Sequence, residues 1–150
     1  LFFTILLGIA LTDVREYIIP DEFTYGGLAI GLLFALVGGL PTLVPALIGA
    51  VVGFALLWLI GFAGHLILKE EAMGGGDVKM MAMVGAFVGW QGVLLTIFLG
   101  ALLGTVIFLP LSLLGRRKLV PFGVFLSVGA AATWIAGAAI IAWYRAYIGL

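Results

Sequence analysis

The feature that most limits how this chain can fold is a series of long segments without a charged residue. Residues 24–40, 42–68 and 122–143 contain no Asp, Glu, Lys or Arg. A helix needs about 20 apolar residues, with a range of roughly 17 to 25, to cross a membrane. Only 9% of the 150 residues are charged and 65% are hydrophobic, whereas a soluble domain usually has about 25% charged residues. We therefore expect the chain to be embedded in a membrane.

The apolar segments predict an all-α, polytopic membrane bundle of about six transmembrane helices. Residues 80–90 and 92–114 add two further segments, and residues 1–12 are interpreted as the end of a first helix. The many glycines and alanines suit close contact between helices in lipid. The chain has no cysteine, which excludes disulfides and cysteine metal sites. Its net charge of zero gives no basis for attracting nucleic acid.

The charged residues predict which helix ends share one side of the membrane. They gather in three connections, within residues 13–22, 69–79 and 116–118. Because successive helices alternate in direction, these three connections should lie on the same side. Of the 7 Lys and Arg residues, only Arg145 lies elsewhere. The positive-inside rule assigns the charged side to the cytoplasm.

Two aspartates differ from the other acids because each closely borders an apolar segment. Asp13 follows residues 1–12, and Asp77 lies just before residues 80–90 in "AMGGGDVKMM". A helix from Asp77 to Trp90 would be only about 21 Å long, shorter than the hydrocarbon core of about 30 Å. We therefore expect Asp77 to lie below the membrane surface, where ionisable groups are costly and commonly functional.

Two carboxylates that approach closely can carry out acid–base hydrolysis. Their repulsion makes the pair hold a single proton, so one can deprotonate a water while the other protonates the carbonyl or the leaving amine. Since the pair titrates as a unit, neither member receives a role in advance. Gly74, Gly75 and Gly76 can reach positive φ and let another backbone come close. The alternative interpretation is a flexible loop that ends in Asp77 as a helix N-cap.

Three ordered motifs resemble those of the type IV prepilin peptidases, also called prepilin leader peptidases. They are "ALTDVREYIIPDEFT", "EEAMGGGDVKMMAMVGAFVGW" and "KLVPFGVFLSVGA", and they cover nearly the whole chain. Members of that family are GxGD-type aspartic proteases of the bacterial inner membrane. The resemblance implies that Asp13 and Asp77 are the catalytic pair, that Gly74, Gly76 and Lys79 support it, and that no metal or cofactor takes part.

The resemblance also implies roles for residues around the pair. The family's P-F-G-P-F-L segment corresponds to residues 121–126, with Val124 in place of the second proline. Possible substrate contacts or turn residues are Pro20, Asp21, Glu70, Glu71, Pro121, Phe122 and Gly123. We expect Asp21 to cap the next helix or contact the substrate, and Lys79 to tune the pair or bind a lipid phosphate. His65 has no second histidine near it in sequence, so a metal site there is not expected.

The implied substrate is a type IV prepilin or pseudopilin with a short basic leader, a glycine at the cleavage site and a hydrophobic helix. Glu70 and Glu71 could attract the leader. Full-length family members usually carry an N-terminal region with paired Cys-x-x-Cys motifs and methyltransferase activity. Neither the zinc site nor that activity is expected in this cysteine-free sequence. We expect a single transmembrane peptidase domain over residues 1–150.

Two other functions fit parts of the pattern. A GxGD intramembrane protease of the signal-peptide-peptidase type would use the same chemistry. It usually places its aspartates within adjacent spanning helices, with a tyrosine beside the first, whereas Asp13 follows Thr12 at a helix end. A small proton- or ion-coupled transporter could bind ions at a glycine-broken helix, but no inverted repeat is visible and the charges gather on one face.

Overall fold

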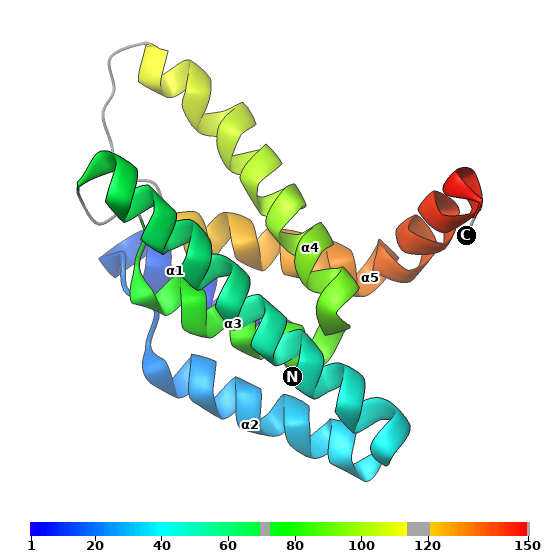
Figure 1. The fold of residues 1–150 in the computed structure, drawn as a ribbon. Helices are drawn as coiled ribbons and strands as arrows, with labels where there is room; N and C mark the ends of the chain where they lie inside the picture. The colour runs from blue at the N-terminus through cyan, green and yellow to red at the C-terminus, as the bar shows by residue number, and fades with distance from the viewer. Residues whose placement is uncertain (70–72, 114–120, 150) are drawn as a thin grey trace.

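The chain folds into a bundle of α-helices, which confirms the predicted fold class. The computed structural model describes residues 1–69, 73–113 and 121–149. Within these residues there are helices and no strands (Figure 1). The elements are α1 (Phe2–Glu16), α2 (Asp21–Val37), α3 (Leu40–Leu68), α4 (Gly75–Leu113) and α5 (Phe122–Ile148).

Two of the predicted helices are joined in α4. Residues 80–90 and 92–114 were expected as separate segments, but α4 is a continuous 39-residue element with one non-helical residue, Gly89 (φ 71, ψ 175). Glycine adopts such a positive φ without the steric cost that other residues incur. The two halves of α4 run in different directions on either side of this kink (Figure 1). The described part therefore has five elements rather than about six, because a kink replaces a loop.

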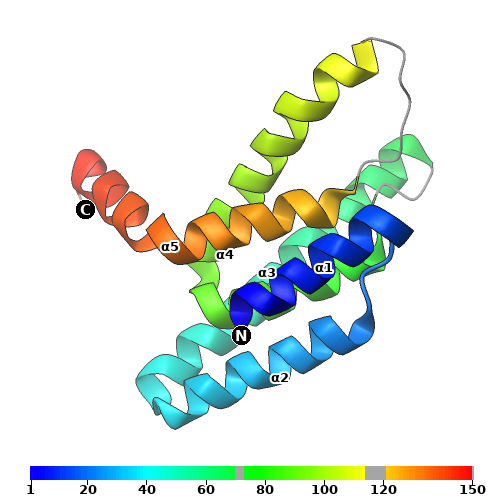
Figure 2. The ribbon, with the colours of Figure 1, turned by 180° about the vertical axis from the view of Figure 1, so that it is seen from behind.

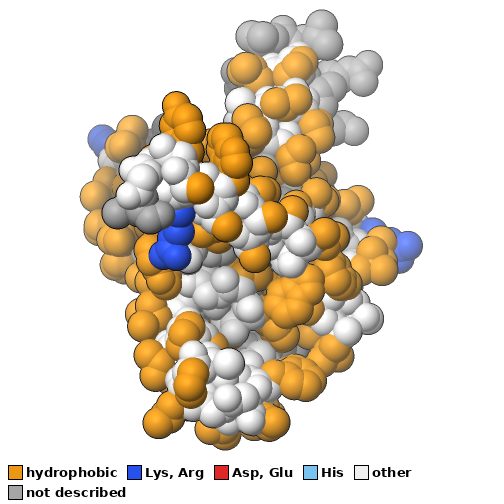
Figure 3. Space-filling model, turned by 90° about the vertical axis from the view of Figure 1, so that its right-hand side faces the viewer, with side chains coloured by type: hydrophobic (Ala, Val, Ile, Leu, Met, Phe, Trp, Pro, Cys, Tyr) orange, Lys and Arg blue, Asp and Glu red, His pale blue; other side chains and the backbone are white. Residues whose placement is uncertain are grey.

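Three helices of the described part are long and apolar enough to cross a membrane: Leu40–Ile67, Gly75–Pro110 and Phe122–Ile148. With 15 and 17 residues, α1 and α2 are shorter than the roughly 20 that a spanning helix needs. They nevertheless expose large apolar side chains, such as Leu7 on α1 and Val37 on α2. Hydrophobic side chains also cover most of the face in Figure 3. Such a surface suits contact with lipid better than contact with water.

The first half of α4 runs through the centre of the bundle. Met80, Met81 and Met83 are 0% exposed. Helix α3 makes the most extensive contact with α4, and α2 and α5 also pack against α4. Where α3 crosses α4, Gly49 and Gly85 bring the two backbones into direct contact, as small residues do between membrane helices. Helices α5 and α1 lie side by side on the face of the molecule seen in Figure 2, which is opposite to the face seen in Figure 1.

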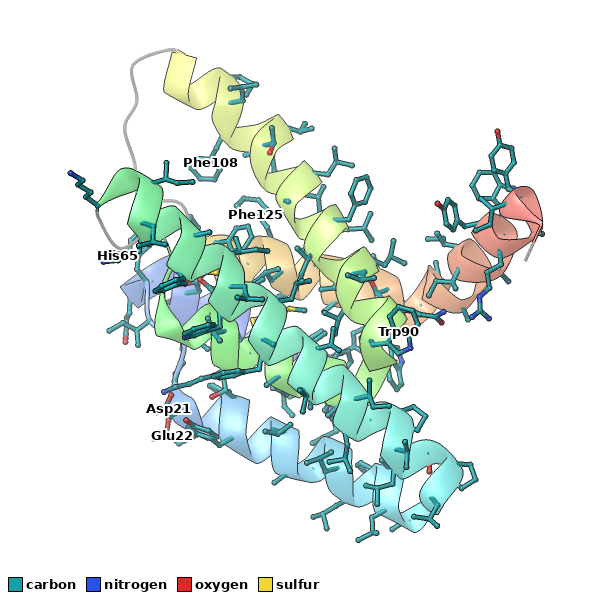
Figure 4. The ribbon with its side chains drawn as sticks, viewed as in Figure 1. Asp21, Glu22, His65, Trp90, Phe108 and Phe125 are labelled. Atoms are coloured by element: carbon teal, nitrogen blue, oxygen red, sulfur yellow. The ribbon has the colours of Figure 1, made fainter. Side chains whose placement is uncertain are left out.

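One end of the bundle collects the charged residues of the described connections. Helix α1 ends there, α2 begins, α3 ends at Leu68 and α4 begins. In Figure 4, Asp21, Glu22 and His65 lie toward this end and Trp90 lies toward the other. The predicted connection at residues 116–118 lies outside the described residues. The helix ends that carry Asp13 and Asp77 thus meet at the charged end.

Candidate active site

The two aspartates predicted as a catalytic pair lie at neighbouring ends of different helices. Asp13 lies in the last turn of α1, which ends where the Tyr17 N–H donates to the Asp13 backbone oxygen at 3.0 Å. Tyr17 adopts the left-handed conformation typical of a helix C-terminus. Asp77 lies in the first turn of α4. Both side chains are buried, Asp13 with 6% and Asp77 with 8% of its surface exposed.

Asp13 and Asp77 line the same cavity, which has a volume of about 300 Å³. The other residues that line it are Tyr17, Ile18, Ile19, Asp21, Gly74, Gly75, Gly76 and Lys79. A larger cavity of about 670 Å³ lies at the Gly89 kink, where Gln91 and Arg145 contribute to its wall. No carboxylate of the described residues lines that larger cavity, so it cannot support chemistry by paired acids. The smaller cavity is therefore the candidate active site.

The first turn of α5 holds one oxygen of Asp13. The Val124 N–H donates to Asp13 Oδ2 at 3.1 Å and also to the Pro121 backbone oxygen at 3.2 Å. The Ser127 hydroxyl donates to the Gly123 backbone oxygen at 2.8 Å, within the same buried turn. Asp13 lies outside the three helices able to span a membrane. Burial raises the pKa of its carboxyl group, and the backbone of Val124 and Gly123 lowers that pKa by a smaller amount.

Asp77 has a different environment. Its Oδ1 is buried and has no hydrogen-bond partner among the described residues. Its backbone N–H donates to the Gly74 oxygen at 3.2 Å. The interpretation of Asp77 as a helix N-cap is wrong, because α4 already begins at Gly75. Buried polar atoms without a partner are rare in folded proteins, and a catalytic role is one of the reasons for which they are retained.

The glycines before Asp77 allow a close contact with another segment and do not adopt an unusual backbone conformation. Contrary to expectation, Gly74, Gly75 and Gly76 do not have positive φ, because the last two already belong to α4. A Cβ atom at Gly76 would lie 2.9 Å from the Cβ of Ile19, whereas a Cβ at Gly75 would meet nothing within 4 Å. Close approach is therefore required at Gly76 alone of these two helical positions.

Ile19 is a residue at this site that sequence reasoning missed. Only 8% of its surface is exposed, and it packs against the starts of both α4 and α5. A Cβ atom at Gly123 would lie 2.9 Å from Ile19 Cδ1 and equally 2.9 Å from Asp13 Oδ2. Apart from its place before Pro20, nothing in the sequence distinguishes Ile19 from the other isoleucines.

Lys79 and Asp21 form an ion pair across the mouth of the site. Lys79 Nζ lies 2.7 Å from Asp21 Oδ1 and 2.9 Å from Oδ2, and 5.2 Å from the centre of the Tyr25 ring. Lys79 thus contacts an acidic and an aromatic side chain of α2, and its predicted contact with a lipid phosphate stays a prediction. Asp21 does not cap α2, since the N-cap is Pro20 and no side chain makes the capping bond. The pair instead connects the first residue of α2 with the N-terminal part of α4.

The remaining predicted residues divide into two groups. Pro121 is the N-cap of α5, and Phe122 and Gly123 are its first residues, beside Asp13. Glu70 and Glu71 lie outside the described residues. In the part of the chain that the structure covers, no group of three or more His, Cys, Asp or Glu could hold a metal ion.

Comparison with known proteins identifies the family. Residues 1–109 match the Type IV leader peptidase family. The chain is 37% identical over 150 residues to the prepilin leader peptidase/N-methyltransferase of Aeromonas salmonicida (strain A449), covering 96% of this chain and 50% of that protein. It is 38% identical over 135 residues to the protein of that name from Stutzerimonas stutzeri, covering 87% of this chain and 45% of that protein. For the protein of Escherichia coli (strain K12) the identity is 34% over 131 residues, covering 86% and 58%.

The chain spans about half the length of these curated relatives. No solved structure matches it. The family match covers both aspartates, and the relatives align over most of this chain. As its three motifs predict, the chain belongs to the Type IV leader peptidase family.

Proposed function

We propose that this chain is a membrane-embedded aspartic endopeptidase that cleaves the basic leader peptide from type IV prepilins or pseudopilins. The observation that carries this proposal is that Asp13 and Asp77, from helices α1 and α4, line one cavity and are both buried. Membership of the Type IV leader peptidase family supports it. So do the names of the relatives, which are prepilin leader peptidases.

The proposed reaction is hydrolysis by a pair of carboxyl groups. Two carboxyls at one site share a proton, so one accepts a proton from the attacking water and the other donates one to the substrate. Asp13 and Asp77 both line the cavity in which the water and the scissile peptide would meet. No covalent intermediate is needed in this reaction.

We place the site at the cytoplasmic face of the bacterial inner membrane. Arg15, Lys69 and Lys79 lie at the same end of the bundle as the cavity, in agreement with the positive-inside rule. Exposed acids at this end, Glu16 and Glu22, would attract a basic leader. The hydrophobic helix of the substrate would remain in lipid against the bundle, and water would reach the scissile bond from the cytoplasm.

A cleavage assay in liposomes with a prepilin leader substrate tests the proposal. Asp13→Asn and Asp77→Asn should each reduce turnover by at least about 10²-fold, since general acid–base catalysis commonly contributes that much or more. Asp21→Asn, at a carboxylate on the cavity wall but paired with Lys79, should retain cleavage. Circular dichroism and thermal unfolding would show that all three variants are folded. Turnover retained in either the Asp13 or the Asp77 variant would refute the assignment, as would a folded wild type that leaves the leader uncut.

A further inference from the structure

We propose that the backbone N–H of Val124 makes Asp13 the general base of the pair and leaves Asp77 as the general acid. This inference rests on the proposed function, because it divides the roles within the same pair. It concerns a hydrogen bond that belongs to this chain and that neither the family motif nor the sequence pattern assigns.

The geometry of the two carboxyl groups is unequal. Asp13 Oδ2 accepts the Val124 N–H at 3.1 Å, and Gly123 leaves room for this approach because its missing Cβ would stand 2.9 Å from that oxygen. Asp77 Oδ1 accepts no bond from the described residues. An N–H from the first turn of a helix stabilises an ionised carboxylate more than a neutral carboxyl. Asp13 is therefore the member better suited to hold the negative charge.

The residue at position 124 decides whether this bond can exist. In the resembling family segment, P-F-G-P-F-L, the fourth position is proline, and proline has no backbone N–H to donate. Here that position is Val124, the third residue of α5. A proline is tolerated in the first turn of a helix, and here it would remove the N–H that both Asp13 Oδ2 and the Pro121 oxygen accept. Val124→Pro is thus a variant that removes one donor and keeps the helix.

The other titratable groups near Asp13 are unchanged by this substitution. Those of the described residues that line the cavity are Tyr17, which follows α1, Asp21 from α2, and Asp77 and Lys79 from α4. The first turn of α5 contributes backbone and no titratable side chain. Any change in the protonation of Asp13 in the proline variant therefore reports the lost N–H rather than a changed charge.

With the roles divided, the proton transfers follow a fixed order. The Asp13 carboxylate takes a proton from water, the water oxygen bonds to the scissile carbonyl carbon, and the carbonyl oxygen takes the proton of Asp77. When the C–N bond then breaks, the leaving nitrogen takes the proton held by Asp13. One hydroxyl of the intermediate returns its proton to Asp77 as the new carboxyl group forms, which restores the starting state.

The pH dependence of kcat/KM tests the role of the N–H, because its acid limb reports the ionisation of the general base. For Val124→Pro we expect this limb to move to higher pH by about one unit, since two or three such bonds lower a carboxyl pKa by about two units. Val124→Ala keeps the N–H and should keep the wild-type limb. If the acid limbs of Val124→Pro and Val124→Ala fall at the same pH, the inference is overturned. If the wild type cleaves and the Asp13 and Asp77 variants do not, the proposed function would still stand.

A second measurement tests the hydrogen bond on which the inference depends, even if the proline variant does not fold. The chain contains two Gly–Val peptides, at residues 92–93 and 123–124, so ¹³C-carbonyl glycine with ¹⁵N-valine selects only these amides in an NMR spectrum. The Val124 amide should shift with pH in the wild type and in Asp77→Asn, and should lose that titration in Asp13→Asn. The Val93 amide should not titrate. A Val124 amide that does not titrate in the wild type, or that titrates unchanged in Asp13→Asn, would refute the hydrogen bond.

Discussion

Substitution of Gly76 by alanine should separate catalysis from stability in this protein. The new Cβ would lie 2.9 Å from the Cβ of Ile19, whereas carbon atoms prefer about 3.5–4.0 Å. The gap that must open is therefore about 0.6–1.1 Å. Because the Cβ of Ile19 is attached directly to the backbone, a rotation of its side chain cannot relieve the contact. The segment between α1 and α2 has to move away from the start of α4.

The expected change in stability is small, because two effects oppose each other. Overpacking of this kind costs about 1–3 kcal/mol, and replacing glycine by alanine within a helix returns about 1 kcal/mol. The net loss is about 0–2 kcal/mol, or a few degrees in Tm for a domain of this size. A misplacement of about 1 Å between reacting groups can reduce the rate by about 10²-fold. Gly76→Ala should therefore lose most of its activity and little of its Tm.

The adjacent position supplies the control. A Cβ at Gly75 meets nothing within 4 Å and lies in the same first turn of α4, so Gly75→Ala should retain cleavage and a wild-type or higher Tm. Leader cleavage and thermal unfolding would be measured for both variants under the same conditions. If Gly76→Ala cleaves as fast as Gly75→Ala, the contact with Ile19 does not set the separation of the aspartates and the reasoning fails.

Two further predictions concern contacts outside the proposed catalytic pair. Lys79→Met should leave Tm nearly unchanged, because its ion pair with Asp21 is partly exposed and such pairs add little to stability. A double-mutant cycle with Asp21→Asn would measure the coupling between the two side chains, and a marked fall in Tm in either single variant that is absent from the cycle's remaining step would contradict this expectation. Gly85→Ala should lower Tm markedly, since its Cβ would collide with the backbone of α3. Gly26→Ala is the control and should not lower Tm, because its Cβ meets nothing within 4 Å. Equal Tm values for Gly85→Ala and Gly26→Ala would contradict the close crossing of α3 and α4.

Hydrophobic segments were enough to predict the helices, because membrane burial depends on length and composition. The segments 42–68 and 122–143 correspond closely to α3 and α5. The break between residues 80–90 and 92–114 was also located nearly correctly, at the Gly89 kink. What the pattern could not show is that one glycine with positive φ can replace a loop. Two apolar segments therefore became parts of a single element.

The site was predictable only where a residue contrasts with its surroundings. Asp13 and Asp77 stand out as carboxylates at the edges of apolar sequence. Ile19 does not stand out, because an isoleucine that fills the space between two glycines resembles any other isoleucine. The partners Lys79 and Asp21 are 58 residues apart, and no periodicity relates them. Such contacts depend on how the helices pack, which local sequence does not encode.

The candidate site also has a consequence for when activity can arise during biogenesis. Its two carboxyl groups and the N–H that contacts one of them come from α1, α4 and α5, and the bond from Val124 to Asp13 joins residues 111 positions apart. A chain in which any one of these helices has not yet docked lacks either a carboxyl group or the donor that holds it. Under the proposed function, proteolytic competence thus requires that α1, α4 and α5 have all docked. A partly inserted molecule could not cut the other proteins of the membrane in which it is still folding.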